Sequence, residues 1–288
     1  MIYKKKHVAI FILSLLILLN IPSIQAVTIL PLDHTNELVQ FQEKHADSNQ
    51  VILNPIEISQ KDLSTFTGSY TALILNPSEY IYGNLHCRKI INKLIPKGYN
   101  IVYLSNEAVD LSYIKFNLSA EIVYINTHAG YWDIDGDNQP DTVVISTGEH
   151  WTNETPQKYQ FEYENQMIVK GRVGDNTFIA FTPALIDYYY EPGDFPNSLI
   201  YMASCYVTYD DSMAQVFLDK GASAYVGWNK NTIFWTNSMT SVRSFRLLTY
   251  GFTVKQVCNL IRSGGLINFF LLSKLTYYGN GNHKIPRL

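Results

Sequence analysis

The chain has 288 residues, of which 47% are hydrophobic and 14% aromatic, enough apolar material for one large core with a smaller unit beside it. Its formal net charge is −3, and it lacks the lysine-rich stripe that phosphate neutralisation needs, which argues against a nucleic acid partner. Only three cysteines occur, and this number excludes a small protein framed by disulfides.

The N-terminus predicts export. Three lysines at 4–6 precede the apolar run VAIFILSLLILL at 8–19, and a short segment then ends at Ala26. This order is typical of a secretory signal peptide, so we expect residues 1–26 to be removed by cleavage after Ala26. The run is about a dozen residues long, against the roughly 20 needed to span a bilayer. We therefore predict a secreted or extracytoplasmic protein with no membrane span after signal cleavage.

Residues 27–65 are polar and only weakly periodic, and we interpret them as an N-terminal extension; whether they act as a propeptide stays open. The main domain is expected at 66–288. It opens with predicted strands at 70–75, 100–104 and 121–127 and a helix at about 79–95 that ends at Pro96-Lys97-Gly98. Strands that alternate with helices predict an α/β fold, with an open, mostly parallel sheet flanked by helices on both faces.

The region 133–196 breaks this alternation. Short apolar runs at 143–145, 167–169 and 177–181, the last two joined by a turn at 174–176, predict a β-rich insertion. An aromatic loop is expected at 188–193. The alternation then returns with these predicted elements: a strand at 197–204, a helix at 211–220, a strand at 222–228, helices at 237–250 and 253–263, and a closing loop at 275–283.

Two residues stand out, because His128 and Cys205 each follow an apolar run where a strand is expected to end. Open α/β sheets gather catalytic groups outside the carboxyl ends of their strands, so these side chains are expected to meet over one crevice. Cys87 and Cys258 share the apolar faces of predicted helices, which indicates core positions, or a disulfide between them. Cys205 lies instead at a strand-to-helix junction, where a nucleophile is typically displayed.

These stretches resemble the caspase-like (clan CD) cysteine peptidases, closest in pattern to the gingipain, clostripain and CHAT-type domains. The segment IYMASC at 200–205, followed by a helix and by GASAYVGW at 221–228, is similar to their catalytic strand and the strand after it. INTHAG at 125–130 is similar to their strand ending in His-Gly, and YYGNGNH at 277–283 to their YGDP closing loop, without the Asp-Pro. The resemblance covers roughly residues 66–288 and implies a caspase-like fold.

By this resemblance Cys205 is the nucleophile and His128 the general acid and base. The thiolate is the attacking species, and a neighbouring imidazole stabilises it and later protonates the leaving amine. The oxyanion would be held by backbone N–H groups of Cys205 and of the glycine after the histidine. Here Ala129 stands directly after His128, and Gly130 follows it, so either amide would have to serve.

An acidic loop begins three residues after Gly130. Its carboxylates occupy loop positions 1, 3, 5 and 9, a spacing of hard oxygen ligands that suits Ca²⁺; they are Asp133, Asp135, Asp137 and Asp141. The loop resembles the DxDGDxxPD calcium loops of exported proteins but lacks the sixth-position glycine and the twelfth-position glutamate of an EF-hand, so Glu149 is a candidate further ligand. Carboxylates this close repel one another unless they are neutralised, which favours calcium over a metal-free acidic turn. Bound calcium would order the segment carrying His128.

Together these features predict an exported cysteine endopeptidase that hydrolyses peptide bonds through a His-Cys dyad and depends on calcium. Its partner would be a protein or peptide substrate, and no organic cofactor is expected. The alternative is a catalytically inactive caspase-like protein that binds calcium and acts in surface binding or adhesion. Acidic residues near the site weakly favour cleavage at Arg or Lys, although Ser204 stands where some relatives have Asp; these residues are Asp187, Glu191, Asp194, Asp210 and Asp211.

Overall fold

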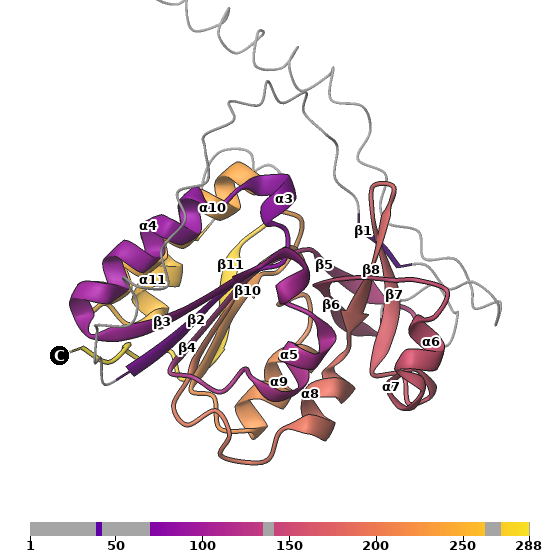
Figure 1. Cartoon of the computed structure of the whole chain (residues 1–288). Coiled ribbons are helices and arrows are strands. Elements are labelled where there is room, and N and C mark those ends of the chain that lie inside the picture. The colour runs from indigo at the N-terminus through magenta and orange to yellow at the C-terminus, as the bar shows by residue number, and fades with distance from the viewer. Residues whose placement is uncertain (1–38, 42–69, 135–140, 263–271, 288) are drawn as a thin grey trace, which may run out of the picture.

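A computed structural model describes residues 39–41, 70–134, 141–262 and 272–287. The predicted signal peptide at 1–26, and all of the predicted extension at 27–65 except one strand, lie outside the described residues. Within the described ranges the chain has an α/β fold with two sheets (Figure 1). The strand orders are β11-β10-β9-β4-β2-β3 in the larger sheet and β1-β7-β8-β6-β5 in the smaller one.

The larger sheet is mostly parallel, as the sequence predicted. Its parallel strands are β2 (Tyr70–Asn76), β3 (Tyr99–Ser105), β4 (Ile122–Asn126), β9 (Leu199–Ala203) and β10 (Ala224–Trp228). A last strand, β11 (Leu275–Gly279), runs antiparallel to β10. The prediction of only a closing loop at 275–283 was therefore wrong. The Asn-Gly repeats that follow suggested a loop, but Leu275 and Tyr277 alternate as a strand requires, and Tyr277 pairs with Val226.

Helices cover both faces of the larger sheet (Figure 1). One face carries α4 (Leu85–Leu94), α10 (Phe234–Thr249) and α11 (Val254–Ile261), and the other carries α5 (Leu111–Phe116), α8 (Pro183–Tyr189) and α9 (Ser212–Asp219). Along β4, the side chains of Ile122 and Tyr124 pack in the core between the sheet and α4, α10 and α11. Those of Val123 and Ile125 pack in the core between the sheet and α5, α8 and α9. Strands buried on both faces have no polar alternation, which explains why their sequences are continuous apolar runs.

The smaller sheet confirms the predicted β-rich segment between β4 and β9. It consists of β5 (Ala129–Trp132), β6 (Thr142–His150), β7 (Ile168–Val173) and β8 (Asn176–Phe181), all antiparallel to their neighbours, with β1 (Val39–Phe41) added parallel to β7. Gly174 in the turn of the β7–β8 hairpin has a φ of 57°, a left-handed conformation that glycine adopts without strain. Two short helices, α6 (Thr155–Lys158) and α7 (Gln160–Glu164), precede β7.

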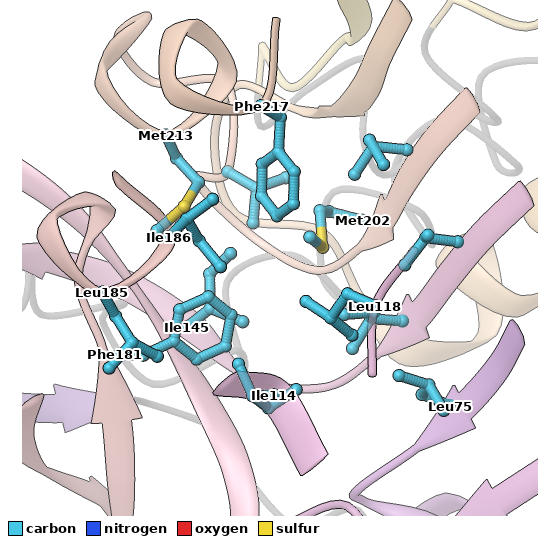
Figure 2. Packing of buried hydrophobic residues seen from close by; sticks show 14 of the residues in the cluster. Leu75, Ile114, Leu118, Ile145, Phe181, Leu185, Ile186, Met202, Met213 and Phe217 are labelled. Carbon is cyan, nitrogen blue, oxygen red and sulfur yellow. The ribbon is translucent and has the colours of Figure 1, made fainter. Parts of the chain in front are cut away.

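One hydrophobic core joins the two sheets (Figure 2). Leu75 and Met202 enter it from the larger sheet, Ile145 and Phe181 from the smaller sheet, and Phe217 from α9. All five side chains are fully buried. Because this core is shared, the sheets form one body, and the short connection between β4 and β5 lies where they meet.

The predicted helix at 79–95 is interrupted. It consists of α3 (Glu79–Tyr82), α4 and the 3₁₀ turn η1 (Ile95–Lys97), because Gly83 takes a φ of 66° between the first two helices. A second 3₁₀ turn, η2 (Asn106–Ala108), follows β3. Among the described residues no helix is long and apolar enough to cross a membrane. The break at Gly83 determines the position of Tyr82, which contacts the candidate site.

Candidate active site

The structure brings His128 and Cys205 to the same end of the larger sheet, where the parallel strands have their carboxyl ends. β4 and β9 are parallel neighbours, and Asn126 lies opposite Ala203 at their carboxyl ends. His128 and Cys205 each follow two residues later in the chain. Neighbouring strands lie about 4.8 Å apart, so the chain leaves both strands at adjacent points. The register therefore brings His128 and Cys205 to neighbouring points beyond the carboxyl ends of the two strands.

Cys205 is the most accessible of the three cysteines. It is partly exposed, whereas Cys87 and Cys258 are buried, and all three are free thiols, so the possible Cys87–Cys258 disulfide is not formed. Burial raises the pKa of Cys87 well above its usual value and that of Cys258 to about 12. Thiols buried in this way are poor nucleophiles, which leaves Cys205 as the candidate for covalent chemistry.

The Cys205 sulfur is held by the loop between β10 and α10. The Thr232 N–H donates to the Sγ atom at 3.3 Å, and the thiol donates to the Thr232 carbonyl at 3.4 Å. A backbone N–H directed at sulfur favours the thiolate, while the carbonyl takes the proton of the neutral thiol. Thr232 can therefore contact both protonation states of Cys205, and nothing in its local sequence predicted this role.

The imidazole of His128 is buried and uncharged. Its side chain is 8% exposed, and burial lowers its pKa to about 4, so the imidazole is uncharged at neutral pH. The Nε2 atom lies 3.2 Å from the Tyr82 hydroxyl, and the Tyr82 ring stacks on Phe234, the first residue of α10, at 4.1 Å. Tyr82 was not singled out from the sequence, because only the helix break at Gly83 directs it to the histidine.

The two backbone amides after the histidine differ in what they can bind. β5 pairs antiparallel with β6, with Gly130 opposite Val144, and the Ser146 N–H donates to the His128 carbonyl at 2.9 Å. Hydrogen-bonded and non-bonded pairs alternate along an antiparallel ladder. This alternation places Gly130 at a bonded position and turns the Ala129 N–H away from β6. Ala129 therefore has the amide that is better placed to bind an oxyanion.

The residue after the cysteine has an unusual backbone conformation. Tyr206 has a φ of 57°, which is uncommon for a bulky residue and costs of order 1–2 kcal/mol. Its ring packs against Tyr131 of β5 at 5.4 Å, and Tyr131 in turn lies 5.5 Å from Tyr209. Strained conformations of this kind cluster at functional sites. The sharp turn follows β9 and leaves Cys205 partly exposed at the carboxyl end of the strand.

Only the ends of the acidic loop are described. Asp133 is 2% exposed, and the Asp141 carboxylate accepts a hydrogen bond from the Ile134 N–H at 2.6 Å. The Asp141 N–H donates to the Trp132 carbonyl at 2.9 Å, so the two ends of the loop are tied together. Asp135 and Asp137 lie outside the described residues. Within the part of the chain that is described, no group of three acidic, histidine or cysteine side chains could hold a metal ion.

Glu149 is not available as the further calcium ligand that the sequence suggested. Its carboxylate accepts hydrogen bonds from Lys158 at 2.6 Å, from the Tyr159 hydroxyl at 2.9 Å and from the Leu111 N–H at 3.1 Å. These contacts tie the end of β6 to α5 and α6. The carboxylate therefore has a structural role, and that expectation was wrong.

Several of the acidic residues named for substrate preference also have partners within the protein. Asp187 forms an ion pair with Lys220 at 3.0 Å, and Asp210 accepts a hydrogen bond from the Ser212 N–H at 2.9 Å. Asp194 accepts one from the Glu191 N–H at 2.7 Å. These carboxylates already have partners within the protein, so their presence does not argue for cleavage at Arg or Lys.

No protein-family model and no curated protein matches the sequence. Among solved structures, the chain is similar to the crystal structure of protein GSU0716 from Geobacter sulfurreducens, at 11% sequence identity and a TM-score of 0.39. The match covers 76% of this chain and 98% of that chain. Similarity at this level carries no argument about function, which must therefore be argued from the geometry at the ends of β4 and β9.

Proposed function

We propose that the protein is an exported, caspase-like cysteine endopeptidase that hydrolyses peptide bonds through Cys205 and His128. The observation that carries the proposal is the register of β4 and β9, which places a partly exposed thiol and a buried neutral imidazole two residues beyond one strand pair. A nucleophile beside a base is the arrangement that acyl transfer requires. Export rests on the signal peptide predicted at 1–26.

In the proposed reaction His128 takes the proton of the Cys205 thiol as sulfur attacks the carbonyl carbon of the scissile bond. The carbonyl oxygen becomes an oxyanion held by the Ala129 and Cys205 amides. The C–N bond then breaks, and the leaving amine takes the proton from His128. Water, deprotonated by His128, hydrolyses the thioester and restores the thiol.

The proposal is tested by covalent labelling with a peptidyl electrophile, followed by mass spectrometry of the labelled peptide. We expect one label, on Cys205, and no label in Cys205→Ala or in the presence of excess peptide substrate. The probe should be offered with calcium present and with the segment 27–65 both kept and removed. Wild-type protein that neither labels nor cleaves a mixed peptide library would favour the alternative, an inactive caspase-like protein that binds calcium in surface attachment.

We further propose that the loop at 133–141 binds Ca²⁺ and holds the His128 segment in place. The hydrogen bonds from Ile134 to Asp141 and from Asp141 to Trp132 support this, since they bring the two ends of the loop together next to β5. Carboxylate oxygens are the ligands that calcium prefers. Because β5 begins directly after His128, ordering of the loop would also order the base.

Calcium is therefore expected to raise both the melting temperature and the peptidase activity. Differential scanning fluorimetry after EDTA treatment, with Ca²⁺ or Mg²⁺ added back, measures the first effect. A matched variant, Asp133→Asn, keeps the size of the side chain and should lose most of the calcium-dependent shift, whereas Asp175→Asn in the β7–β8 turn should keep it. Equal melting temperatures and activities with and without EDTA would contradict calcium binding.

A further inference from the structure

One asparagine on α10 contacts the ends of both strands that carry the candidate dyad. Asn237 is 5% exposed and lies in the first turn of the helix. Its Nδ2 group donates to the Ala203 carbonyl at 2.8 Å and to Asn126 Oδ1 at 3.4 Å, and its Oδ1 accepts from Trp228 Nε1 at 3.0 Å. A side-chain amide has two N–H donors and one carbonyl, so every polar atom of Asn237 is used.

Its two donors point to equivalent places in the site. Ala203 is the last residue of β9 and precedes Cys205 by two positions, and Asn126 is the last residue of β4 and precedes His128 by two positions. Asn126 and Ala203 also lie opposite each other in the sheet. Asn237 therefore ties together the two points from which the nucleophile and the base extend.

The same network reaches the tyrosine that contacts the histidine. Asn126 Nδ2 donates to Asn76 Oδ1 at 2.7 Å, and Asn76 Nδ2 donates to the Gly83 carbonyl at 3.1 Å. Gly83 directly follows Tyr82. Linked buried amides of this kind favour one arrangement, because the side-chain oxygens of Asn76 and Asn126 each accept from a neighbouring asparagine. The network therefore defines the relative positions of β2, β4, β9 and the α3–α4 turn.

We propose that Asn237 is a positioning residue, which fixes the spacing between Cys205 and His128 by tying the ends of β9 and β4 to α10. The inference rests on the proposed peptidase dyad, and it assigns no chemical step to Asn237 itself. Catalytic geometry is sensitive on this scale, since a misplacement of about 1 Å can lower a rate by about 10²-fold. The Asn237 amide binds the ends of both β4 and β9, so its loss would allow the two strand ends to shift relative to each other by a distance of that size.

The test compares Asn237→Leu with Ser244→Ala, a matched variant on the same helix. The buried Ser244 hydroxyl contacts the Tyr201 hydroxyl at 3.1 Å, in the middle of β9 and away from its end. Each variant is studied at a temperature at which circular dichroism shows it to be folded. The measured quantities are kcat, KM and the rate of Cys205 alkylation by iodoacetamide, followed by mass spectrometry.

Asn237→Leu is expected to lower kcat by about 10²-fold with a smaller change in KM, and to slow alkylation, because the imidazole no longer lies where it assists the thiol. Ser244→Ala should leave all three within about twofold of wild type. If Asn237→Leu does not fold, Asn126→Ala replaces it. That variant removes the hydrogen bonds of Asn126 to Asn237 and to Asn76, and it should lower kcat while the contact between Asn237 and Ala203 remains.

Two results would overturn the inference. The first is a lowered melting temperature in Asn237→Leu with kcat equal to that of Ser244→Ala, which would show a purely structural asparagine. The second is alkylation of Cys205 at the same rate in both variants. The alkylation measurement does not depend on peptide hydrolysis. A wild-type protein without peptidase activity would therefore refute the proposed function, while the alkylation rates would still decide whether Asn237 positions the thiol and the imidazole.

Discussion

Replacing Cys205 by alanine is expected to abolish peptide hydrolysis, and replacing His128 by alanine to lower kcat/KM by about 10²–10⁴-fold. Without the sulfur no thioester forms, so the covalent route is lost entirely. Without the imidazole the thiol has no base beside it, and the leaving amine has no proton donor. Steady-state kinetics with a peptide selected from a library, in buffer containing calcium, measures both effects.

The matched control is Cys258→Ala, which removes a thiol that is buried in the core on the α4, α10 and α11 face of the larger sheet. It should lose stability through the small cavity that it creates, but keep kcat at temperatures where it is folded. Hydrolysis that persists in Cys205→Ala, or that falls equally in Cys258→Ala, would rule out Cys205 as the nucleophile.

The second large effect is a loss of stability at mildly acidic pH. Burial lowers the pKa of His128 to about 4, and that of His86 also to about 4 despite the opposing influence of Glu79. Both histidines titrate near 6.5 when the chain is unfolded. The unfolded state therefore binds more protons between pH 6.5 and 4, so stability is complete above pH 6.5 and falls as the pH decreases through this window. At pH 5 each histidine is expected to cost about 2 kcal/mol relative to pH 8.

Urea unfolding at pH 8, 7, 6 and 5 measures this dependence. Replacing one of the two histidines with glutamine should remove roughly half of the decrease contributed by the pair, since one of two titrating groups is gone. Burial also lowers the pKa of His283, which adds a contribution of the same sign that neither variant removes. Ser244→Ala should lower stability equally at every pH. A free energy of unfolding that stays constant from pH 8 to pH 5 would show that the imidazoles are solvated.

Much of the larger sheet was predictable because its strands are buried on both faces. Continuous apolar runs such as the one at 121–127 have few alternatives to a central parallel strand, and the break at 174–176 has the residues of a tight turn. His128 and Cys205 were identifiable for the same reason, since each follows such a run directly. That the two strands before them are neighbours could be expected only from the fold class. The structure shows this directly through the pairing of Asn126 with Ala203.

The residues that contact the candidate dyad could not be predicted from the sequence. Tyr82, Thr232 and Asn237 reach the site from three different segments, and each has an ordinary local sequence. Their roles depend on how α3 and α10 pack on the sheet, which is a tertiary property. The strand at 275–279 was missed because its pairing with β10 outweighs the turn-forming residues that follow it.

The short connection between β4 and β5 has a mechanical consequence. Thr127 and His128 alone link the two sheets at this point, and both are fastened to Ser146 of β6, through the Thr127 hydroxyl at 2.8 Å and the His128 carbonyl at 2.9 Å. Cys205, in contrast, extends from the larger sheet only. Sliding of one sheet over the other would move His128 while Cys205 stayed in place. The core shared by the two sheets therefore maintains the alignment of the proposed catalytic pair.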